Sequence, residues 1–354
     1  QPTPKQLATL QAWIAEGAKG PTDDRSILST LSVPMATPAT TAQRPITALS
    51  ISHDNQLAVA AFKQVQVGDR VLTDHPGKVN AVAFSPDGRW LAAATGVAGL
   101  RGEALLWDLK NGARVGTFAT GHRDTLYGVA FSPDGATLAT AGYDRLIQLW
   151  DRKTGKLLRT LEGHNGPVHD IAFSPDGEVI VSAGGDSSVK LWNTNTGQRL
   201  DTMGQSTGEQ FSAAFTSNGK HIVAAGADKQ IRLWKWLSKD KPQINPLVLV
   251  RFAHEDEINA LAISPSGTRI ASASADLTVK TWSLPDLRMI QTFADQPDVV
   301  SALAFSSDGK SLHVGRMDGS LQKLEMKDHQ PQTSVAQNHD HRAIVRDRES
   351  VKLT

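Results

Sequence analysis

One short phrase recurs along this chain at nearly regular intervals. Each copy is a short apolar run that leads into Ser-Pro-Asp-Gly or a close variant of it. Aligning the apolar residue before each turn gives seven copies, at Ile51, Phe84, Phe131, Phe173, Phe215, Ile263 and Phe305. Successive copies are 33, 47, 42, 42, 48 and 42 residues apart. A period of about 40–45 residues is typical of one blade of a β-propeller.

Each copy predicts four short strands separated by tight turns. In VAFSPDG, an alternating apolar strand runs into a turn in which Pro fixes φ and Gly accepts a positive φ. Strands such as LATAGYD, LIQLWD and KLLRTL follow. Strands this short bury both faces only when blades stack against one another. The sequence therefore predicts an all-β fold, a seven-bladed β-propeller over residues 45–337.

The copies resemble the WD40 repeat. A Gly-His pair precedes the clearest copies, and Leu-Trp-Asp or Leu-Trp-Asn ends them, as in Gly121-His122 with Trp150 and Gly163-His164 with Trp192. The resemblance covers roughly residues 45–326 and implies a hydrogen-bonded tetrad of His, Ser or Thr, Asp and Trp in a complete blade. The implied tetrads are His122, Thr140, Asp144 and Trp150; His164, Ser182, Asp186 and Trp192; and His254, Ser272, Asp276 and Trp282.

Three copies depart from this pattern. The fifth keeps Asp228 and Trp234 but has Ala224 where the hydroxyl belongs. The seventh has Leu324 and the first has Gly68 at the Trp position. We therefore expect the first, fifth and seventh blades to be held by packing alone and to open more easily than the others.

No residue pattern predicts a catalytic, cofactor-binding or metal site in this chain. His122, Asp144 and a nearby hydroxyl look like a hydrolase triad, but three copies of one arrangement favour a repeated buried polar network. GxxxxGK[ST] and HExxH are absent, and there is no cysteine. The segment Asn338–His341 contains possible nitrogen and oxygen ligands, but a short polar tail of this kind is usually solvated.

Composition narrows the class of partner. The chain has 37 basic and 36 acidic residues, a formal net charge of +1, and no basic stripe of the kind that nucleic-acid binders carry. No apolar run approaches the ~20 residues that span a bilayer. We therefore expect one or more protein partners of unknown identity, no nucleic acid and no membrane span.

The resemblance to WD40 propellers implies that partners contact the loops that lead into the first strand and that link the second strand to the third. The candidate residues of this face are Lys78, Asn80, Arg101, Thr125, Tyr127, Tyr143, His169, Glu257, Asn259 and Met317. Both tyrosines of the chain belong to this set. They either form part of an interface or simply pack against each other. Residues 95–104, an insertion in the second copy, are expected to form a functional loop.

The N-terminal flank resembles a different family. Residues 3–17 predict a helix, with Thr3 as N-cap and Gly17 beyond its end. The stretch TPKQLATLQAWIAEGAKGP resembles the closing helix of cytochrome c-like domains joined to propellers in planctomycete-type bacteria. This implies an upstream haem-attaching CxxCH, with haem as the cofactor of that missing part alone, and an exported or periplasmic protein. An unrelated amphipathic helix and a cytoplasmic location are the alternatives.

The predicted organisation is a helix over residues 1–19, a linker over 20–44, the propeller over 45–337 and a charged tail over 338–354. Either residues 27–33 or residues 332–337 are expected to supply the outer strand of the seventh blade. The leading functional hypothesis is a non-catalytic protein-interaction scaffold. Its alternatives are an auxiliary domain of a redox or hydrolytic enzyme whose active site lies elsewhere, and a small-ligand site in the central channel.

Overall fold

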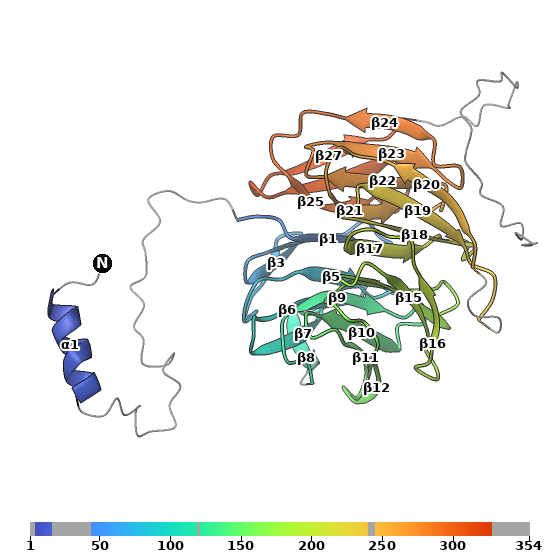
Figure 1. Cartoon of the computed structure of the whole chain (residues 1–354). Coiled ribbons are helices and arrows are strands. Elements are labelled where there is room, and N and C mark those ends of the chain that lie inside the picture. The colour runs from blue at the N-terminus through green and yellow to red at the C-terminus, as the bar shows by residue number, and fades with distance from the viewer. Residues whose placement is uncertain (1–3, 16–43, 119–120, 240–244, 328–354) are drawn as a thin grey trace, which may run out of the picture. The chain divides into compact units, whose positions relative to one another are not determined.

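The computed structural model describes residues 4–15, 44–118, 121–239 and 245–327. The chain divides into two compact units, residues 1–42 and residues 43–354. The first contains a helix, α1 (Pro4–Ala15). The second is a propeller of seven sheets, which confirms the predicted fold (Figure 1). No helix in the described part of the chain is long and apolar enough to cross a membrane.

The seven sheets, numbered here as blades 1–7 in chain order, are antiparallel meanders. Blades 1–3 contain β1 (Ala48–Ile51), β2 (Leu57–Ala61), β3 (Gln64–Val67), β4 (Arg70–Leu72); β5 (Ala81–Phe84), β6 (Trp90–Val97), β7 (Arg101–Asp108), β8 (Ala113–Phe118); and β9 (Leu126–Phe131), β10 (Thr137–Gly142), β11 (Ile147–Asp151), β12 (Leu157–Leu161). Blades 4 and 5 contain β13 (Val168–Phe173), β14 (Val179–Gly184), β15 (Val189–Asn193), β16 (Arg199–Met203); and β17 (Gln210–Phe215), β18 (His221–Gly226), β19 (Gln230–Lys235), β20 (Leu247–Phe252). Blades 6 and 7 contain β21 (Ile258–Ile263), β22 (Arg269–Ser274), β23 (Val279–Ser283), β24 (Met289–Phe293); and β25 (Val300–Phe305), β26 (Ser311–Arg316), β27 (Leu321–Glu325).

The recurrent Ser-Pro-Asp-Gly sequence forms the turn between the first and second strands of a blade. In blade 3, Ser132 Oγ donates to Asp134 and accepts from the backbone N–H of Thr137. Gly135 has φ of +68°, a conformation in which a side chain would be strained. The turn chemistry therefore fixes the hairpin at the point where the sequence predicts it.

The insertion in blade 2 is a pair of long strands rather than the loop that we expected. β6 and β7 pair without interruption from Trp90 opposite Asp108 to Val97 opposite Arg101. The expectation was wrong because the inserted residues continue the ladder in register and so satisfy their own backbone hydrogen bonds. At the tip, Gly99 N–H donates to Asp124 of blade 3 at 2.9 Å.

The apolar core lies between blades. Each of six clusters of buried apolar side chains combines residues from two consecutive blades, from blades 1 and 2 through to blades 6 and 7. Leu91 and Trp107 of blade 2, for example, pack with Ala58 and Val65 of blade 1. A blade therefore completes its burial only through its neighbours.

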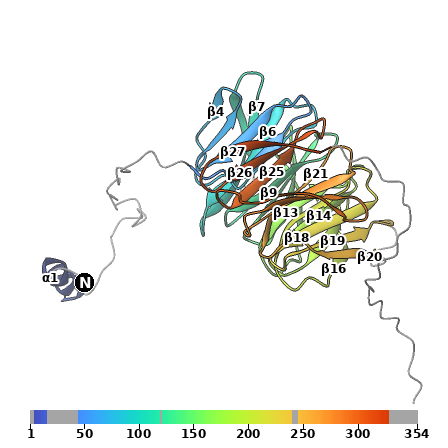
Figure 2. The same ribbon diagram turned by 90° about the horizontal axis from the view of Figure 1, so that it is seen from above.

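The ring closes where β1 of blade 1 lies against β25 of blade 7, so that the two ends of the propeller meet (Figures 1 and 2). Ile46 N–H donates to the Arg316 carbonyl at 3.0 Å, and Ser301 Oγ donates to the Ile46 carbonyl at 2.5 Å. Ile46 is 4% exposed, and a Cβ at Gly315 would lie 2.5 Å from its side chain. These contacts fasten the last seam without an apolar cluster of the kind described at the other six.

Blade 7 shows three strands among the described residues. A groove of about 700 Å³ beside it is lined mainly by residues of blade 1, together with Gly319 and Leu321 of blade 7. The two segments expected to supply the outer strand, residues 27–33 and 332–337, lie outside the described residues, as does the tail over 338–354.

Replacing Ile46 with Ala should weaken the closing seam. We expect Ile46→Ala to lower the free energy of unfolding by about 2–5 kcal/mol, because it removes a buried side chain that its surroundings cannot refill. Urea unfolding measures this loss. Val71→Ala, at a position that is 52% exposed, is the matched control and should change the free energy by less than about 0.5 kcal/mol. Equal effects of the two variants would contradict this account of the seam.

Candidate functional site

In blade 4, four side chains form one directional chain of hydrogen bonds. Trp192 Nε1 donates to Ser182 Oγ at 2.8 Å, and Ser182 Oγ lies 2.7 Å from His164 Nε2. His164 Nδ1 lies 3.0 Å from Asp186. A neutral imidazole protonated on Nδ1 satisfies every link, because Nε2 then accepts from the hydroxyl while Nδ1 donates to the carboxylate.

Blade 3 repeats this arrangement. Trp150 Nε1 donates to Thr140 Oγ1 at 3.0 Å, His122 Nε2 lies 3.0 Å from the same oxygen, and His122 Nδ1 lies 2.9 Å from Asp144. The carboxylate also accepts the backbone N–H of Arg123 at 3.0 Å. It therefore fixes both the imidazole and the loop that leads into the first strand.

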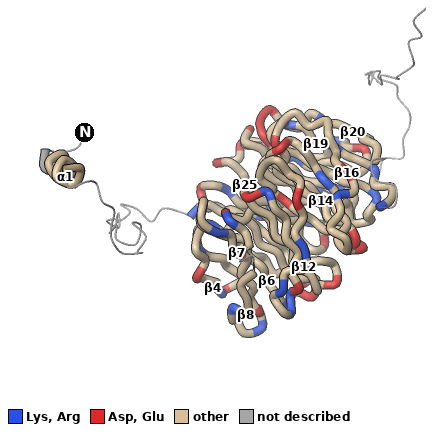
Figure 3. The backbone as a smooth tube through the Cα atoms, turned by 60° about the horizontal axis from the view of Figure 1, so that its bottom comes forward, with Lys and Arg blue, Asp and Glu red and all other residues tan. Residues whose placement is uncertain are grey.

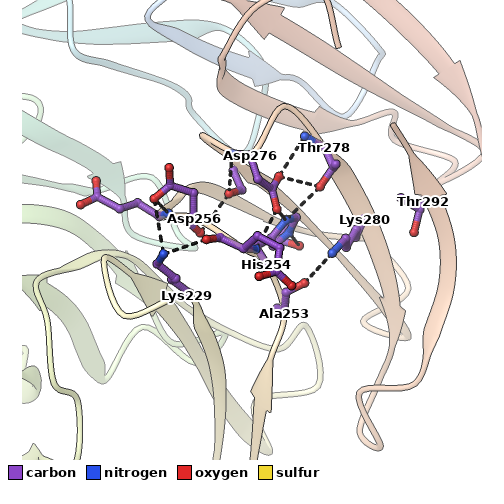
Figure 4. Close-up of polar contacts among 12 residues, drawn as sticks. Lys229, Ala253, His254, Asp256, Asp276, Thr278, Lys280 and Thr292 are labelled. Atoms are coloured by element: carbon purple, nitrogen blue, oxygen red, sulfur yellow. Dashed lines mark hydrogen bonds and ion pairs between the residues drawn. The ribbon is translucent and has the colours of Figure 1, made fainter. Parts of the chain in front are cut away.

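Blade 6 carries the third tetrad, shown in part in Figure 4. His254 lies 3.0 Å from Asp276 and 2.8 Å from Ser272, and Trp282 Nε1 donates to Ser272 Oγ at 2.9 Å. Thr278 Oγ1 donates to the Asp276 carboxylate at 2.7 Å. The structure thus brings together the four side chains of each of the three sets that the resemblance implies.

The bridging hydroxyls of the three tetrads are closed to solvent. Thr140, Ser182 and Ser272 are each 0% exposed. A buried hydroxyl cannot reach a substrate carbonyl, so the three His-Asp-hydroxyl sets do not act as hydrolase triads in this conformation. Their role is to satisfy one another and to tie three strands of a blade together.

Burial and charge set the protonation of the blade 4 tetrad. Burial lowers the pKa of His164 to about 4, helped by Lys190 and opposed by Asp186. Burial alone would raise the pKa of Asp186, but hydrogen bonds from Lys190 Nζ and Ser188 Oγ outweigh it and hold that pKa well below its ordinary value. At neutral pH the tetrad therefore combines a neutral imidazole with a carboxylate.

Two of the blades expected to depend on packing alone have buried arginine networks instead, so that expectation was wrong for them. In blade 5, Arg232 pairs with Asp228 at 2.6 Å, and both side chains are almost fully buried. In blade 7, Arg316 donates to Gln296 and Ser320. A guanidinium can replace an imidazole here because its several N–H groups reach acceptors on neighbouring turns.

Blade 2 contains half of a tetrad, which the sequence analysis missed. His75 lies nine residues before Phe84, the same spacing as His122 before Phe131. Its ring lies 5.9 Å from that of Trp107, centroid to centroid.

Ala93 occupies the register position that carries the bridging hydroxyl in blades 3, 4 and 6. Within the described residues, both ring nitrogens of His75 and Trp107 Nε1 are buried without a hydrogen-bond partner. Burial lowers the pKa of His75, opposed by the nearby Lys63 carbonyl.

The candidate partner residues divide by exposure. The exposed ones are Lys78, Arg101, Tyr143, Glu257 and Met317. The half-buried ones are Asn80, Thr125, Tyr127, His169 and Asn259. Arg101 pairs with Glu103 on the blade 2 hairpin at 2.6 Å. The cavity at the centre of this face, which is described in the next paragraph, is not lined by Arg101, Glu257 or Met317.

A central channel opens on this face, and one repeat position surrounds it. The position lies four residues before the aligned apolar residue of each copy. Its seven occupants are Thr47, Asn80, Tyr127, His169, Phe211, Asn259 and Ser301. All seven line a cavity of about 320 Å³, called here the channel mouth. Extending the repeat alignment to this position would have predicted Phe211, which the sequence analysis overlooked.

Aromatic rings gather on one side of the channel mouth. Tyr143 stacks edge-on against Tyr127 with centroids 6.3 Å apart, Tyr127 lies 5.5 Å from His169, and His169 lies 5.3 Å from Phe211. We call these four residues the aromatic row. Tyr143 is 52% exposed at its outer end, so the two tyrosines pack against each other and also present a surface.

No cluster of three or more His, Asp or Glu side chains in the described ranges could hold a metal ion. The segment Asn338–His341, considered above as a source of ligands, lies outside those ranges.

A closed ring of seven antiparallel sheets, three of them with Trp-hydroxyl-His-Asp chains, defines a β-propeller of the WD type. The family model described as "WD domain, G-beta repeat" matches residues 67–108, 112–151, 155–193, 197–235 and 246–283, more than half of the chain. The chain therefore belongs to the WD40 repeat family. Each matched segment contains the outer strand of one blade and the first three strands of the next blade.

Two curated relatives match shorter stretches. The chain is 34% identical over 79 residues to "Periodic tryptophan protein 2 homolog" of Schizosaccharomyces pombe, which covers 22% of this chain and 9% of that protein. It is 29% identical over 80 residues to "Periodic tryptophan protein 2" of Arabidopsis thaliana, which covers 23% and 9%. The similarity thus spans about a tenth of each relative's length.

Removing the blade 4 carboxylate should destabilise the propeller. We expect Asp186→Ala to lower the free energy of unfolding by about 1–3 kcal/mol, because buried donors on His164 and Lys190 lose their acceptor. Chemical unfolding of both proteins measures the difference. Asp69→Ala, at an exposed turn position, is the control and should have little effect. An unchanged transition midpoint for Asp186→Ala would exclude a stabilising role for the tetrad.

Acidification should destabilise the fold through His164. Its pKa is about 4 in the folded protein, against an ordinary value of 6.5. Between pH 4 and pH 6.5, the unfolded chain therefore binds a proton at His164 that the folded chain does not bind. This contribution to stability is complete above pH 6.5 and is lost as the pH falls towards 4. Between pH 7 and pH 5 we expect a loss of about 2 kcal/mol from this residue.

Urea unfolding of the wild type and of His164→Gln at both pH values isolates this contribution. The variant should lose less stability on acidification. The same pH dependence in both proteins would show that His164 is not the group responsible.

Proposed function

We propose that this chain is a non-catalytic scaffold that binds a protein partner through the channel mouth and the aromatic row. The proposal is supported above all by one repeat position, which holds different types of residue in different blades. On consecutive blades 3, 4 and 5 it holds Tyr127, His169 and Phe211, whereas on the other four blades it holds small polar side chains. Packing of the repeats does not require this division, because the same strands form with either kind of residue.

The aromatic row has the features of a contact surface. It extends from exposed Tyr143 at the rim to Phe211 at the channel, and the inter-ring contacts hold each ring in place before a partner arrives. Rigid aromatic side chains provide large contact areas at low conformational cost, and tyrosine adds a polar tip. A partner side chain that covers this row would gain apolar burial without reorganising the surface.

Polar groups next to the row would orient such a partner. His169 Nε2 lies 3.1 Å from Glu209 at the rim. Within the channel mouth, burial raises the pKa of Asp170 to about 6, against hydrogen bonds from Ser212 Oγ and the Ala213 N–H. Lysine and arginine residues are interspersed with acidic ones over the propeller (Figure 3). This distribution supports a protein partner over a nucleic acid, which would favour a single basic stripe.

A small ligand in the channel is a second candidate. The channel mouth has a volume of about 320 Å³, and among its seven ring residues Thr47 alone is β-branched. The two candidates can be separated, because Tyr127 lines the channel mouth and Tyr143 does not. A channel ligand would lose affinity in Tyr127→Ala and keep it in Tyr143→Ala.

The resemblance of the N-terminal segment supports a further proposal, that the propeller belongs to an exported c-type cytochrome protein and serves a redox or hydrolytic domain upstream. Helix α1 exposes Leu7, Trp13 and Ile14 by 44%, 46% and 58%, a surface that a neighbouring domain would cover. Haem absorbance in the native full-length polypeptide, together with a CxxCH upstream of residue 1, would support it. A reading frame that starts at the helix would rule it out.

Replacing Tyr127 and Tyr143 together with Ala should weaken partner capture by about tenfold or more, as expected for the loss of two aromatic anchors. The measurement is affinity capture from extracts of the source cells, with the recovered partner quantified against the wild type. Val248→Ala, an exposed apolar position on β20, is the control. Undiminished capture by a double variant with an unchanged melting temperature would contradict the proposed surface.

A further inference from the structure

A second groove lies between blades 2 and 3, away from the channel mouth. It has a volume of about 590 Å³, and its walls include Trp90, Leu106, Val115, Phe118, Arg152 and Lys153. Trp90 is one of the tryptophans that lie outside the repeated Trp position, so the tetrads do not account for it.

The groove is at the opposite end of the blades from the tetrad carboxylates. Asp144 lies in the turn after β10, and β11 then runs antiparallel back across the sheet to Asp151. Arg152 and Lys153 follow in the turn that leads to β12. This groove and the channel mouth therefore open on different faces of the propeller.

Two guanidinium groups stack on Trp90. The Cζ atoms of Arg89 and Arg152 lie 4.6 Å and 5.0 Å from the ring centroid. Arg89 is neutralised by Asp108, at 2.9 Å. Arg152 has no carboxylate within ion-pairing distance in the described parts of the chain. Its charge nevertheless helps to lower the pKa values of Asp87 and Asp151, each lowered mainly by a side-chain hydrogen bond, from Ser85 and from Thr154.

The guanidinium of Arg152 is nevertheless held in place. Its Nε donates to the Gly135 carbonyl at 2.7 Å, its backbone N–H donates to the Ala136 carbonyl at 2.9 Å, and Trp90 supports its plane. Among the described residues, Nε is the side-chain nitrogen of Arg152 that donates a hydrogen bond. The terminal nitrogens of a guanidinium form a fork that matches a carboxylate. A cation that is already positioned loses little conformational freedom when it binds.

The rest of the groove adds charge of the same sign and apolar surface. Lys153 is exposed and, within the described ranges, has no ion-pair partner. None of the residues that line the groove is acidic. Val115, which is 49% exposed, and Phe118, which is buried, line the same groove. The groove therefore combines apolar surface with two cations that form no ion pair among the described residues.

We propose that this groove binds an extended acidic segment of a second protein partner. A carboxylate of that segment pairs with Arg152 and Lys153, and an adjacent apolar side chain packs on Val115. The apolar wall favours a peptide over a nucleic acid, whose affinity depends on many phosphate contacts rather than on two cations. Because the groove and the channel mouth are on different faces, the propeller would hold two partners at once.

Fluorescence anisotropy with the full chain tests the proposal. The probes are fluorescein-labelled octapeptides of alternating Leu and Glu or Asp, with matched peptides of Leu and Gln or Asn. We expect the acidic peptides to bind, and to bind more weakly as salt rises. Arg152→Gln and Val115→Glu should each weaken binding by about tenfold, a loss typical of a central contact. Lys156→Gln, in the same turn but outside the groove, and Tyr143→Ala should leave it unchanged.

Several results would overturn the proposal. These are no binding of any acidic peptide, equal binding of the neutral peptides, or affinities that Arg152→Gln and Val115→Glu leave unaltered while their melting temperatures match the wild type. Tighter, Arg152-dependent binding of a labelled twelve-nucleotide single strand would assign the groove to nucleic acid instead. Because Tyr143→Ala disrupts the aromatic row alone, this experiment and the test of partner capture at the channel mouth can fail separately.

Discussion

The whole structure depends on burial between blades. Every described apolar cluster combines side chains of two neighbouring blades, and a single four-stranded sheet has no core of its own. The ring must therefore close for any blade to be stable. The seam between blades 7 and 1 achieves this with buried Ile46 and with hydrogen bonds from Ser301 Oγ and the Ile46 N–H. This seam gives the first and last blades their second neighbour.

Packing constrains some repeat positions and leaves others free, and the free ones carry the proposed functions. Strand faces must be small or apolar, and the turns must contain residues that satisfy their backbone. The position around the channel has no such requirement, and there the seven blades differ most in character, from Phe211 to Ser301. At the opposite end of the blades, Trp90 and Arg152 are likewise side chains that the packing of the repeat does not require. Two faces of a rigid ring are thus available for different partners.

The sequence predicts the fold well because a repeat amplifies a weak signal. A single Ser-Pro-Asp-Gly turn indicates little, but seven spaced copies define the blades. The tetrads around Trp150, Trp192 and Trp282 are what the resemblance to the WD40 repeat implies, residue by residue. Departures from the repeat are harder to predict. In blade 5, Arg232 forms the buried polar network in place of the histidine that the repeat pattern leads one to expect. In blade 2, the strand pairing across residues 95–104 depends on the register of the two strands, which composition does not reveal.

We infer that a blade gains stability when one hydroxyl connects its Trp to its His. In blade 2, His75 and Trp107 are present without that hydroxyl, so this blade allows the hydroxyl to be added. Ala93→Ser places it at the register position of the tetrads, whereas Ala94→Ser, equally buried, points to the other side of the sheet. Chemical unfolding should show Ala93→Ser to be more stable than Ala94→Ser by about 1 kcal/mol or more. Equal stabilities, or the reverse order, would contradict the account.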